Sequence, residues 1–209
     1  SFNVIIEKLN NSSKPVILAG RGIEIANVRE EFRKLVETLK IPVVTSMIAI
    51  DSLEQNSKYN YGFIGAYGNR FSNIILNNSD LIISMGSRLD RRQIGNNLEL
   101  FAPKAQIIRI DIDHDEFSRK VKNEEIEICA SLTSIFNFLL EKKNEIKPRF
   151  KKWIGYCDYV KYKLQARDRQ LSNIMVNEIS KYVPDGVTIT TDVGQNQVWV
   201  AQSFALKDK

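Results

Sequence analysis

The sequence predicts an α/β protein with a three-layer main domain, in which helices cover both faces of a mainly parallel sheet. Short aliphatic runs bounded by turn residues, such as KPVILAG at 14–20 and DLIISMG at 80–86, are typical of strands buried on both faces. Segments with apolar residues three and four positions apart lie between these runs and indicate amphipathic helices. Strands that alternate with helices in this way favour parallel βαβ units.

The first strand is predicted at 14–22, where it ends in a Gly-rich turn, and the helix at 27–40 follows it. Further strands are predicted at 41–45, 80–86, 105–113 and 126–130, with helices at 70–77 and 132–140. Residues 46–69 are rich in Gly, Asn, Ser and Tyr and are interpreted as a short helix and a long surface loop. Loops of that length in a compact domain are usually functional.

The 209 residues suffice for one full core and leave a remainder too short for a second complete domain. We therefore predict a main domain over 1–145, a linker helix over 146–170 and an incomplete α/β segment over 171–209. In the last segment, a helix at 173–183, a strand at 187–192 and a helix from 195 to 204 are expected. The missing initiator Met suggests an excised piece of a longer protein.

Much of the net charge of +5 comes from residues 142–169, a basic stretch with interleaved aromatic side chains. Such a pattern occurs on surfaces that stack nucleic-acid bases. The aromatic residues recur every three to four positions, however, which favours one face of a helix that packs on the domain. No nucleic-acid partner is therefore predicted. The aromatic residues concerned are Phe150, Trp153, Tyr156, Tyr159 and Tyr162.

No apolar run approaches the roughly 18 to 20 residues that cross a bilayer, and no secretion signal is recognisable, so no membrane association is predicted. Cys129 and Cys157 lack metal-binding spacing and are interpreted as buried, reduced thiols of a cytoplasmic protein. The only histidine, His114, lies in a polar turn without a second metal-ligating neighbour. The chain is thus expected to contribute no metal ligand and no catalytic residue.

Candidate binding residues follow the carboxyl ends of the predicted strands, where open parallel sheets bind ligands. Gly20 and Gly22 could let the backbone approach a phosphate, with Arg21 as its counter-charge. A tight turn between strand and helix requires glycines as well, so both interpretations stay open. Asp111 could accept hydrogen bonds from a ribose or an adenine, whereas Asp113 fits the cap of a following helix.

The segment GSRLDRR at 86–92 offers a second group of candidates. Gly86 ends a buried strand, and the guanidinium groups of Arg88 and Arg92 alternate with the carboxylate of Asp90. Such groups could grip a diphosphate or a flavin carbonyl in bidentate fashion. A solvated loop of paired charges is the alternative. Motif spacing alone therefore predicts a nucleotide-binding-like α/β domain and does not identify its activity.

Six segments together resemble the acetolactate synthase group of thiamine-diphosphate enzymes, in the order that this family has. They are KPVILAGRG, IPVVTS, GFIGAYGN, NNSDLIISMGSRLDRRQIG, AQIIRIDIDHDE and, near the end, TTDVGQNQVWVAQ, with the fourth combining a strand and the arginine segment. All but the last resemble the central domain of the family, which implies a Rossmann-like or DHS-like domain with a mainly parallel six-stranded sheet. The last resembles the opening of its diphosphate-binding domain.

The resemblance implies a parent enzyme that uses thiamine diphosphate and Mg2+ to decarboxylate a 2-oxo acid and transfer the remaining fragment to an acceptor carbonyl. A small-molecule 2-oxo acid substrate and a homo-oligomer, dimer or tetramer, are expected, because active sites in this family form between two subunits. This piece is expected to be inactive alone, since other elements of the site lie outside it. A parent that decarboxylates only, or one that modifies a sugar, would use the same scaffold.

The family's central domain holds FAD in some members, ADP or CoA-like groups in others, and nothing in many. Arg88, Asp90 and Arg92 stand where the flavin-holding members have Arg, Asp and Arg. Ile64 replaces a family His in the GFIG segment, and Ser131 replaces an Asp, which instead favours a structural spacer for oligomer contacts with an empty nucleotide site. A dehydrogenase-like NAD site is less favoured because no G-x-G-x-x-G opens a helix.

In the last segment, Gly194, Gln195 and Asn196 resemble the strand-turn-helix that meets the diphosphate of thiamine, where backbone N–H groups at a helix N-terminus suit an anion. Asn196 replaces a residue that is often His in the family. The predicted cofactor-binding residues are Gly20, Arg21, Gly22, Gly65, Gly86, Arg88, Asp90, Arg92, Asp111, Gly194, Gln195 and Asn196.

Overall fold

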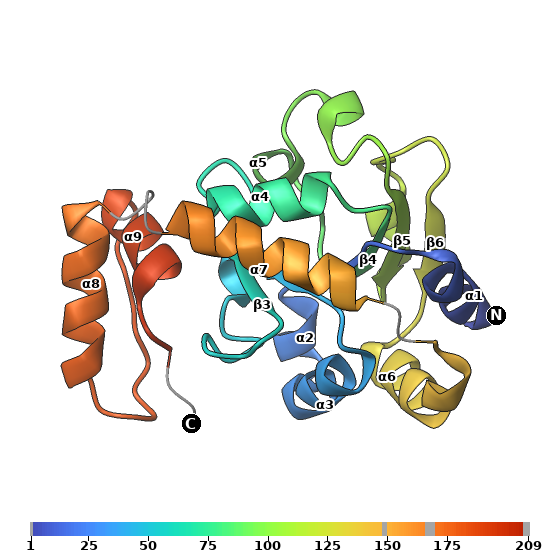
Figure 1. Ribbon diagram of the computed structural model, residues 1–209, viewed down its shortest axis with the longest axis horizontal. Coiled ribbons are helices and arrows are strands. Elements are labelled where there is room, and N and C mark those ends of the chain that lie inside the picture. The colour runs from blue at the N-terminus through green and yellow to red at the C-terminus, as the bar shows by residue number, and fades with distance from the viewer. Residues whose placement is uncertain (1, 148–149, 166–169, 207–209) are drawn as a thin grey trace.

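The computed structural model describes residues 2–147, 150–165 and 170–206 and contains a six-stranded, all-parallel sheet in the order β3-β2-β1-β4-β5-β6 (Figure 1). This confirms the predicted fold class. Parts of the predicted linker helix, at 148–149 and 166–169, lie outside the described residues. The strands are β1 Pro15–Ala19, β2 Val43–Thr45, β3 Asn60–Phe63, β4 Leu81–Met85, β5 Gln106–Asp111 and β6 Ile126–Cys129.

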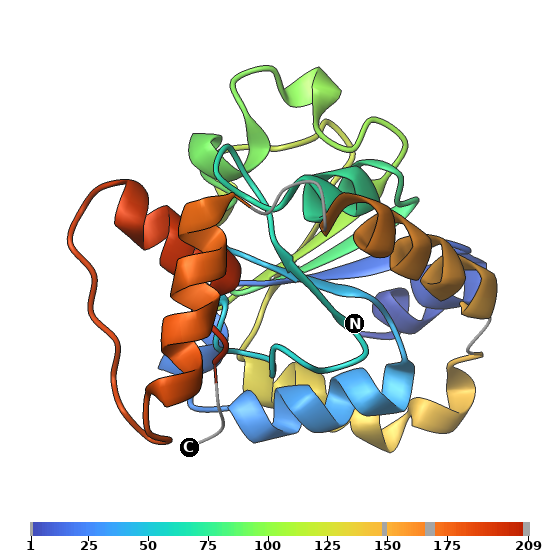
Figure 2. The same ribbon diagram turned by 60° about the vertical axis from the view of Figure 1, so that its left-hand side comes forward.

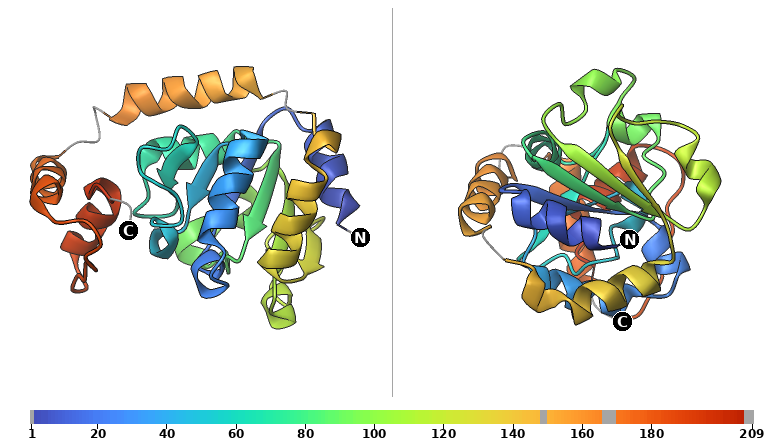
Figure 3. Two further views of the ribbon diagram at one scale, coloured as in Figure 1. Left: turned by 90° about the horizontal axis from the view of Figure 1, so that it is seen from below. Right: turned by 90° about the vertical axis from the view of Figure 1, so that its right-hand side faces the viewer.

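Helices cover both faces of the sheet, and a hydrophobic core lies between the sheet and the helices on each face (Figure 3). On one face, α1, α3 and α6 pack on the strands, and on the other face α4 and α7 do so. The α-helices are α1 Asn3–Asn11, α2 Gly22–Ile25, α3 Arg29–Leu39, α4 Arg70–Asn77, α5 Arg91–Ile94, α6 Leu132–Glu141, α7 Lys151–Gln165, α8 Leu171–Tyr182 and α9 Gln195–Ser203. Single 3-10 turns are η1 Met47–Ala49, η2 Leu98–Leu100, η3 His114–Phe117 and η4 Lys143–Glu145.

The two cores follow from the period of two along each strand, which sends successive side chains to opposite faces. In β1, Ile17 belongs to the core under α3 and α6, whereas Val16 and Leu18 belong to the core under α4 and α7. All five residues of β1 are buried, as are those of β4. A continuous aliphatic run is therefore the correct signature of these central strands.

β3 lies inside the segment that the sequence predicts to be a long loop, so that prediction is wrong at residues 60–63. Tyr61 and Phe63 are buried, but Gly62 between them has φ +69°, which is not a strand conformation. The pairing register with β2 shifts at this point. A short edge strand with a Gly-centred irregularity therefore carries little of the alternating pattern on which the prediction relied.

The strand predicted at 187–192 does not form. Residues 184–194 are exposed in an irregular connection between α8 and α9, and no strand of the described chain lies alongside to complete a ladder. Without such a partner, the backbone N–H and C=O groups remain with solvent. α8 and α9 pack on each other beyond the carboxyl ends of β1–β3 (Figure 2).

The basic linker helix α7 packs on the domain, as predicted, and Phe150 and Trp153 of the predicted aromatic face are buried, but its three tyrosines are not. The indole Nε1 of Trp153 donates to the carbonyl oxygen of Pro15 at 2.9 Å, and Cys157 and Val160 are buried below it. The tyrosines of the predicted face point outward, with Tyr162 at 77% exposure. The packed positions are offset from the three-residue spacing of the tyrosines, which does not follow a helical face for long.

The two cysteines differ in environment. Cys157 is fully buried, and burial raises the pKa of its thiol. Cys129, predicted to be buried, is exposed because β6 is an edge strand whose alternate side chains face outward. Both are free thiols. Within the described chain, no helix is both long and apolar enough to cross a membrane.

Asp80, just before β4, provides a test of acid stability. Burial alone would raise the pKa of its carboxyl, but hydrogen bonds from Ser12, Ser13 and Lys14 outweigh burial and lower that pKa. The stabilisation is therefore present above the unfolded pKa of about 3.9 and is lost as the pH falls through the lower folded pKa. Urea denaturation of Asp80→Asn and wild type should differ at neutral pH and converge in acid. A difference that is constant between pH 7 and pH 2 would contradict this assignment.

Candidate functional site

The carboxyl edge of the sheet has its switch point between β1 and β4, and there three glycines bring two turns into backbone contact. Gly20 N–H donates to the Met85 carbonyl at 2.9 Å, and Gly22 N–H donates to the Gly86 carbonyl at 3.0 Å. A Cβ on Gly20 would lie 2.0 Å from the Gly86 oxygen, and one on Gly22 would lie 2.7 Å from the Gly86 Cα. Contact between the two turns therefore accounts for these glycines.

Gly65 has a similar explanation one turn further along the edge. Its φ is +112°, and a Cβ there would lie 2.6 Å from the carbonyl oxygen of Arg92. The next residue, Ala66, donates its N–H to that same oxygen at 2.8 Å. The loop after β3 is thus fixed to α5, which brings two predicted site residues together.

The arginine segment forms a capped turn. The Asp90 carboxylate accepts from the N–H groups of Arg92 at 2.7 Å and Gln93 at 3.2 Å, and so caps the N-terminus of α5. The Arg88 Nε contacts Glu116 at 2.8 Å, and the Arg88 side chain is 80% exposed. One carboxylate oxygen of Asp90 is therefore used in bonds to the backbone, while the side chain of Arg88 stays exposed at the surface.

Asp113 is a helix cap, as the sequence indicated, whereas the ligand role of Asp111 stays a prediction. Asp113 caps the single turn η3 by accepting from Asp115 N–H at 2.9 Å. Asp111, at the end of β5, accepts from Asp113 N–H at 3.1 Å and keeps a half-buried carboxylate at the edge. It retains acceptor capacity that a ligand could use.

A buried ion pair under this edge was missed by the sequence reasoning. Arg109, on β5, contacts Glu125 at 2.9 Å, and the two side chains are only 3% and 0% exposed. Arg109 also donates to the carbonyl oxygens of Arg119 and Glu116, so one guanidinium fixes the loop between β5 and β6. An arginine within an otherwise aliphatic strand, IIRI, is the signal that could have revealed it.

Gly194, Gln195 and Asn196 lie at the exposed N-terminus of α9. No side chain caps this helix, so its first backbone N–H groups have no partner within it. Asp192 instead accepts from the N–H of Val193 at 2.7 Å. An uncapped helix start of this kind presents donors and a partial positive charge to an anion.

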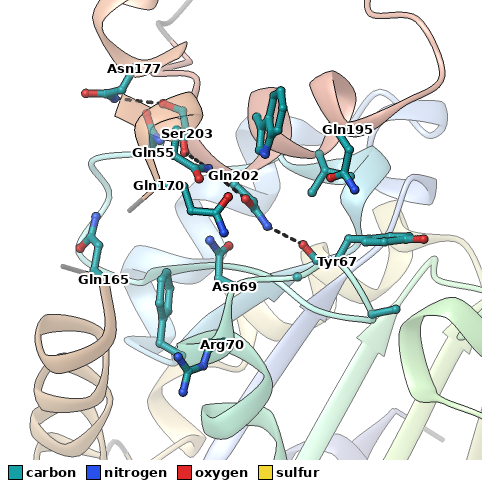
Figure 4. Close-up of a pocket in the computed structure, with 16 residues that line it drawn as sticks. Gln55, Tyr67, Asn69, Arg70, Gln165, Gln170, Asn177, Gln195, Gln202 and Ser203 are labelled. Carbon is teal, nitrogen blue, oxygen red and sulfur yellow. Dashed lines mark hydrogen bonds between the residues drawn. The ribbon is translucent and has the colours of Figure 1, made fainter. Parts of the chain in front are cut away.

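Three large cavities surround the edge, and they divide the predicted residues among them. The first, of about 500 Å³, lies between the loop after β3 and the helices α8 and α9, and Gln195 lines it (Figure 4). The second, of about 490 Å³, is lined by Arg21. The third, of about 520 Å³, is lined by Gly65 and Arg92. Arg88, Asp90 and Asp111 line none of these three.

Charges in the second cavity are paired. Arg29 contacts Asp51 at 2.9 Å and also bonds to Glu24, and Arg21 lies 3.9 Å from Asp51. Arg21 is therefore not a lone counter-charge for a phosphate. Across residues 2–147, 150–165 and 170–206, no three His, Cys, Asp or Glu side chains come together to hold a metal ion.

Fold and edge together define an open, parallel, Rossmann-like α/β domain, with a helical segment attached beyond its carboxyl end. Residues 2–139 match the family model described as thiamine pyrophosphate enzyme, central domain. The chain belongs to this family.

Curated relatives are similar over nearly the whole chain. The acetolactate synthase large subunit of Lactococcus lactis is 34% identical over 98% of this chain and 36% of its own length. A probable acetolactate synthase large subunit of Methanococcus aeolicus is 32% identical over 95% of the chain. Isozyme 1 of the Escherichia coli large subunit is also 32% identical, over 95% of the chain. The chain spans about a third of the length of these relatives.

Proposed function

We propose that the protein containing this chain decarboxylates a 2-oxo acid and joins the remaining fragment to an acceptor carbonyl, as an acetolactate synthase does. One observation carries the proposal: the similarity to acetolactate synthase large subunits covers 98% of the chain, whereas the central-domain match ends at residue 139. The similarity therefore includes the helices α7, α8 and α9. A 2-oxo acid substrate, a cytoplasmic location and a homo-oligomeric assembly without nucleic acid or membrane partners complete the proposal.

The start of α9 fits the diphosphate of thiamine diphosphate. Its uncapped N–H groups are exposed, and a diphosphate would supply the acceptors that they lack. When bound, thiamine diphosphate supplies the electron sink for decarboxylation, while the protein supplies position and charge. In this chain, Gln195 and Asn196 would hold the diphosphate through their backbone N–H groups, and Asn196 would present a neutral amide where many relatives have a protonatable imidazole.

Proline at the first position of α9 tests this role. Gln195→Pro removes one N–H donor, yet proline is tolerated at the first helical position. Since a hydrogen bond to a charged group contributes about 1.5–3 kcal/mol, the affinity of the full-length protein for thiamine diphosphate should fall by about 10- to 100-fold. Acetolactate formed from pyruvate, titrated with thiamine diphosphate at saturating Mg2+, gives that affinity.

Leu171→Pro is the matched control, because Leu171 is the exposed first residue of α8 and follows an equally extended residue. It should leave the affinity unchanged. In the same assay the 209-residue chain alone should give no turnover. Turnover by this chain alone, or equal losses in both proline variants, would contradict the proposal.

The geometry favours the second interpretation of the nucleotide site, a spacer without bound FAD. Gly20, Gly22 and Gly86 fill the switch point by touching one another, so they form no cradle for a diphosphate. Of the two predicted arginines of this segment, Arg92 lines the third cavity and Arg88 lines none of the three. The predicted residues therefore do not form a single enclosed site that would hold FAD.

A calorimetric titration of the chain with FAD, and with ADP for comparison, tests the spacer interpretation. We expect neither ligand to give saturable heats at concentrations up to about 1 mM, a regime in which even weak specific ligands saturate. Arg88→Ala, which removes a predicted arginine whose side chain is 80% exposed, should then give the same trace as wild type. Saturable FAD binding that Arg88→Ala abolishes would establish a flavin site instead.

A further inference from the structure

The cavity between the loop after β3 and the helices α8 and α9 adjoins the start of α9, but its side-chain amides are not used in the proposed diphosphate contacts, which are made by backbone N–H groups. Its walls come from two parts of the chain that are more than 90 positions apart in sequence, the loop around Tyr67 and Asn69 and the C-terminal helices (Figure 4). At about 500 Å³ it is within the range of pockets that enclose small organic ligands.

Carboxamide side chains dominate this lining. Among the described lining residues, Arg70 is the one that carries a charge. The carboxamides are Gln55, Asn69, Gln165, Gln170, Asn173, Asn177, Gln195 and Gln202. An amide both donates and accepts, so such a lining matches neutral groups that do the same and offers little to a phosphate or a carboxylate.

Some of these amides hold the walls together. Asn173, which is buried, donates to the side chains of Gln202 at 2.9 Å and Ser203 at 2.8 Å. Gln202 in turn donates to the carbonyl oxygen of Tyr67 at 2.8 Å, which joins α9 to the loop after β3 (Figure 4). The cavity is thus fixed by its own hydrogen bonds before any ligand enters.

Other amides are available to a ligand. The side chains of Gln55, Gln170 and Gln195 are exposed and make no hydrogen bond to any residue that the structure describes. Three aromatic residues also line the cavity: Phe71 is buried, whereas Tyr67 is 56% exposed and Trp199 is half-buried. Aromatic faces pack against the C–H faces of sugar rings, while hydroxyl groups, like amides, donate and accept at once.

We propose that this cavity binds a neutral polyhydroxylated ring, a monosaccharide or a monosaccharide unit of a larger molecule. The match lies in three amides that stay free within the described chain, those of Gln55, Gln170 and Gln195, beside two accessible aromatic faces, a combination that suits ring hydroxyl groups, which donate and accept at once. This site goes beyond the proposed carboligation, because sugar binding requires neither thiamine diphosphate nor turnover.

Calorimetry of the 209-residue chain with D-glucose, D-galactose and N-acetyl-D-glucosamine tests this site, with uridine and adenosine as separate arms. At least one sugar should bind saturably. Gln170→Leu, which removes the amide at an exposed position, should weaken the binding of that sugar at least 5-fold. Trp199→Phe, which keeps an aromatic face, should weaken it less than Trp199→Ala.

Gln197→Leu is the matched control, because Gln197 lies on the same helix α9 but lines the second cavity. It should leave sugar affinity unchanged, and circular dichroism melts of the leucine variants should coincide with wild type. Absence of saturable sugar binding, binding of uridine or adenosine alone, or equal weakening by Gln197→Leu would each overturn the proposal. The acetolactate assay of the full-length protein is a separate experiment, so failure of sugar binding would not contradict the proposed carboligation, and failure of carboligation would not contradict sugar binding.

Discussion

Replacing Arg109 with methionine is expected to lower the free energy of unfolding by about 3–5 kcal/mol, the range for breaking a buried ion pair from one side. The substitution leaves the Glu125 carboxylate, which is 0% exposed, without its guanidinium partner. It also releases the carbonyl oxygens of Glu116 and Arg119 that Arg109 holds. The loop between β5 and β6 would therefore lose its main internal support.

Equilibrium urea denaturation, followed by circular dichroism, measures this loss. Arg88→Met is the matched control, since Arg88 also contacts a glutamate but is 80% exposed, and it should cost no more than about 1 kcal/mol. Adding Glu125→Gln to Arg109→Met should recover part of the stability, because a neutral amide can still accept from the N–H groups of Val121 and Lys122. A loss below about 1 kcal/mol for Arg109→Met would show that water reaches Glu125.

Gly20→Ala is the second substitution with a large expected effect. The added Cβ would meet backbone atoms only, with the Gly86 oxygen at 2.0 Å and the Gly86 carbon and Ser87 Cα at 2.5 Å. Since no flexible side chain can give way, the turns after β1 and β4 must separate. We expect a loss of about 3 kcal/mol, at the upper end of what overpacking usually costs.

Gly155→Ala is the control for the glycine series. Gly155 lies inside α7, and nothing lies within 4 Å of the position that its Cβ would occupy. The same one-carbon change should therefore stabilise the protein by about 0.5–1 kcal/mol through helix propensity. Thermal melts of both variants, compared with wild type, measure these changes in stability. A Gly20→Ala melt that matches wild type would mean that the two turns are not in contact in solution.

The strands of the centre could be predicted from the sequence because burial on both faces leaves a continuous aliphatic run, as in β1 and β4. β3 could not, because Gly62 interrupts its alternation and its register with β2 shifts. The strand predicted at 187–192 failed for the opposite reason: local propensity was adequate, but a strand also needs a neighbour. Edges and pairings are tertiary properties that a single segment does not encode.

The sequence placed the candidate residues at the carboxyl edge of the sheet, but it did not predict which structural role each of them has. The alternatives stated for Gly20 and Asp113, a tight turn and a helix cap, are what the structure contains. Asp90 behaves in the same way as a cap of α5. Arg109 was missed because its partner Glu125 is 16 positions away, across a loop whose path no local pattern predicts.

The bond between Trp153 and Pro15 has a consequence for how the chain folds. β1 sits in the middle of the sheet and pairs with β2 on one side and β4 on the other, so both halves of the domain assemble against it. The carbonyl group of Pro15, at the start of β1, accepts its hydrogen bond from the indole of Trp153, which lies 138 positions later in the chain. Loop-closure entropy grows with that separation, and contacts between distant segments slow folding. We therefore expect α7 to dock after the sheet has formed and to complete the second core.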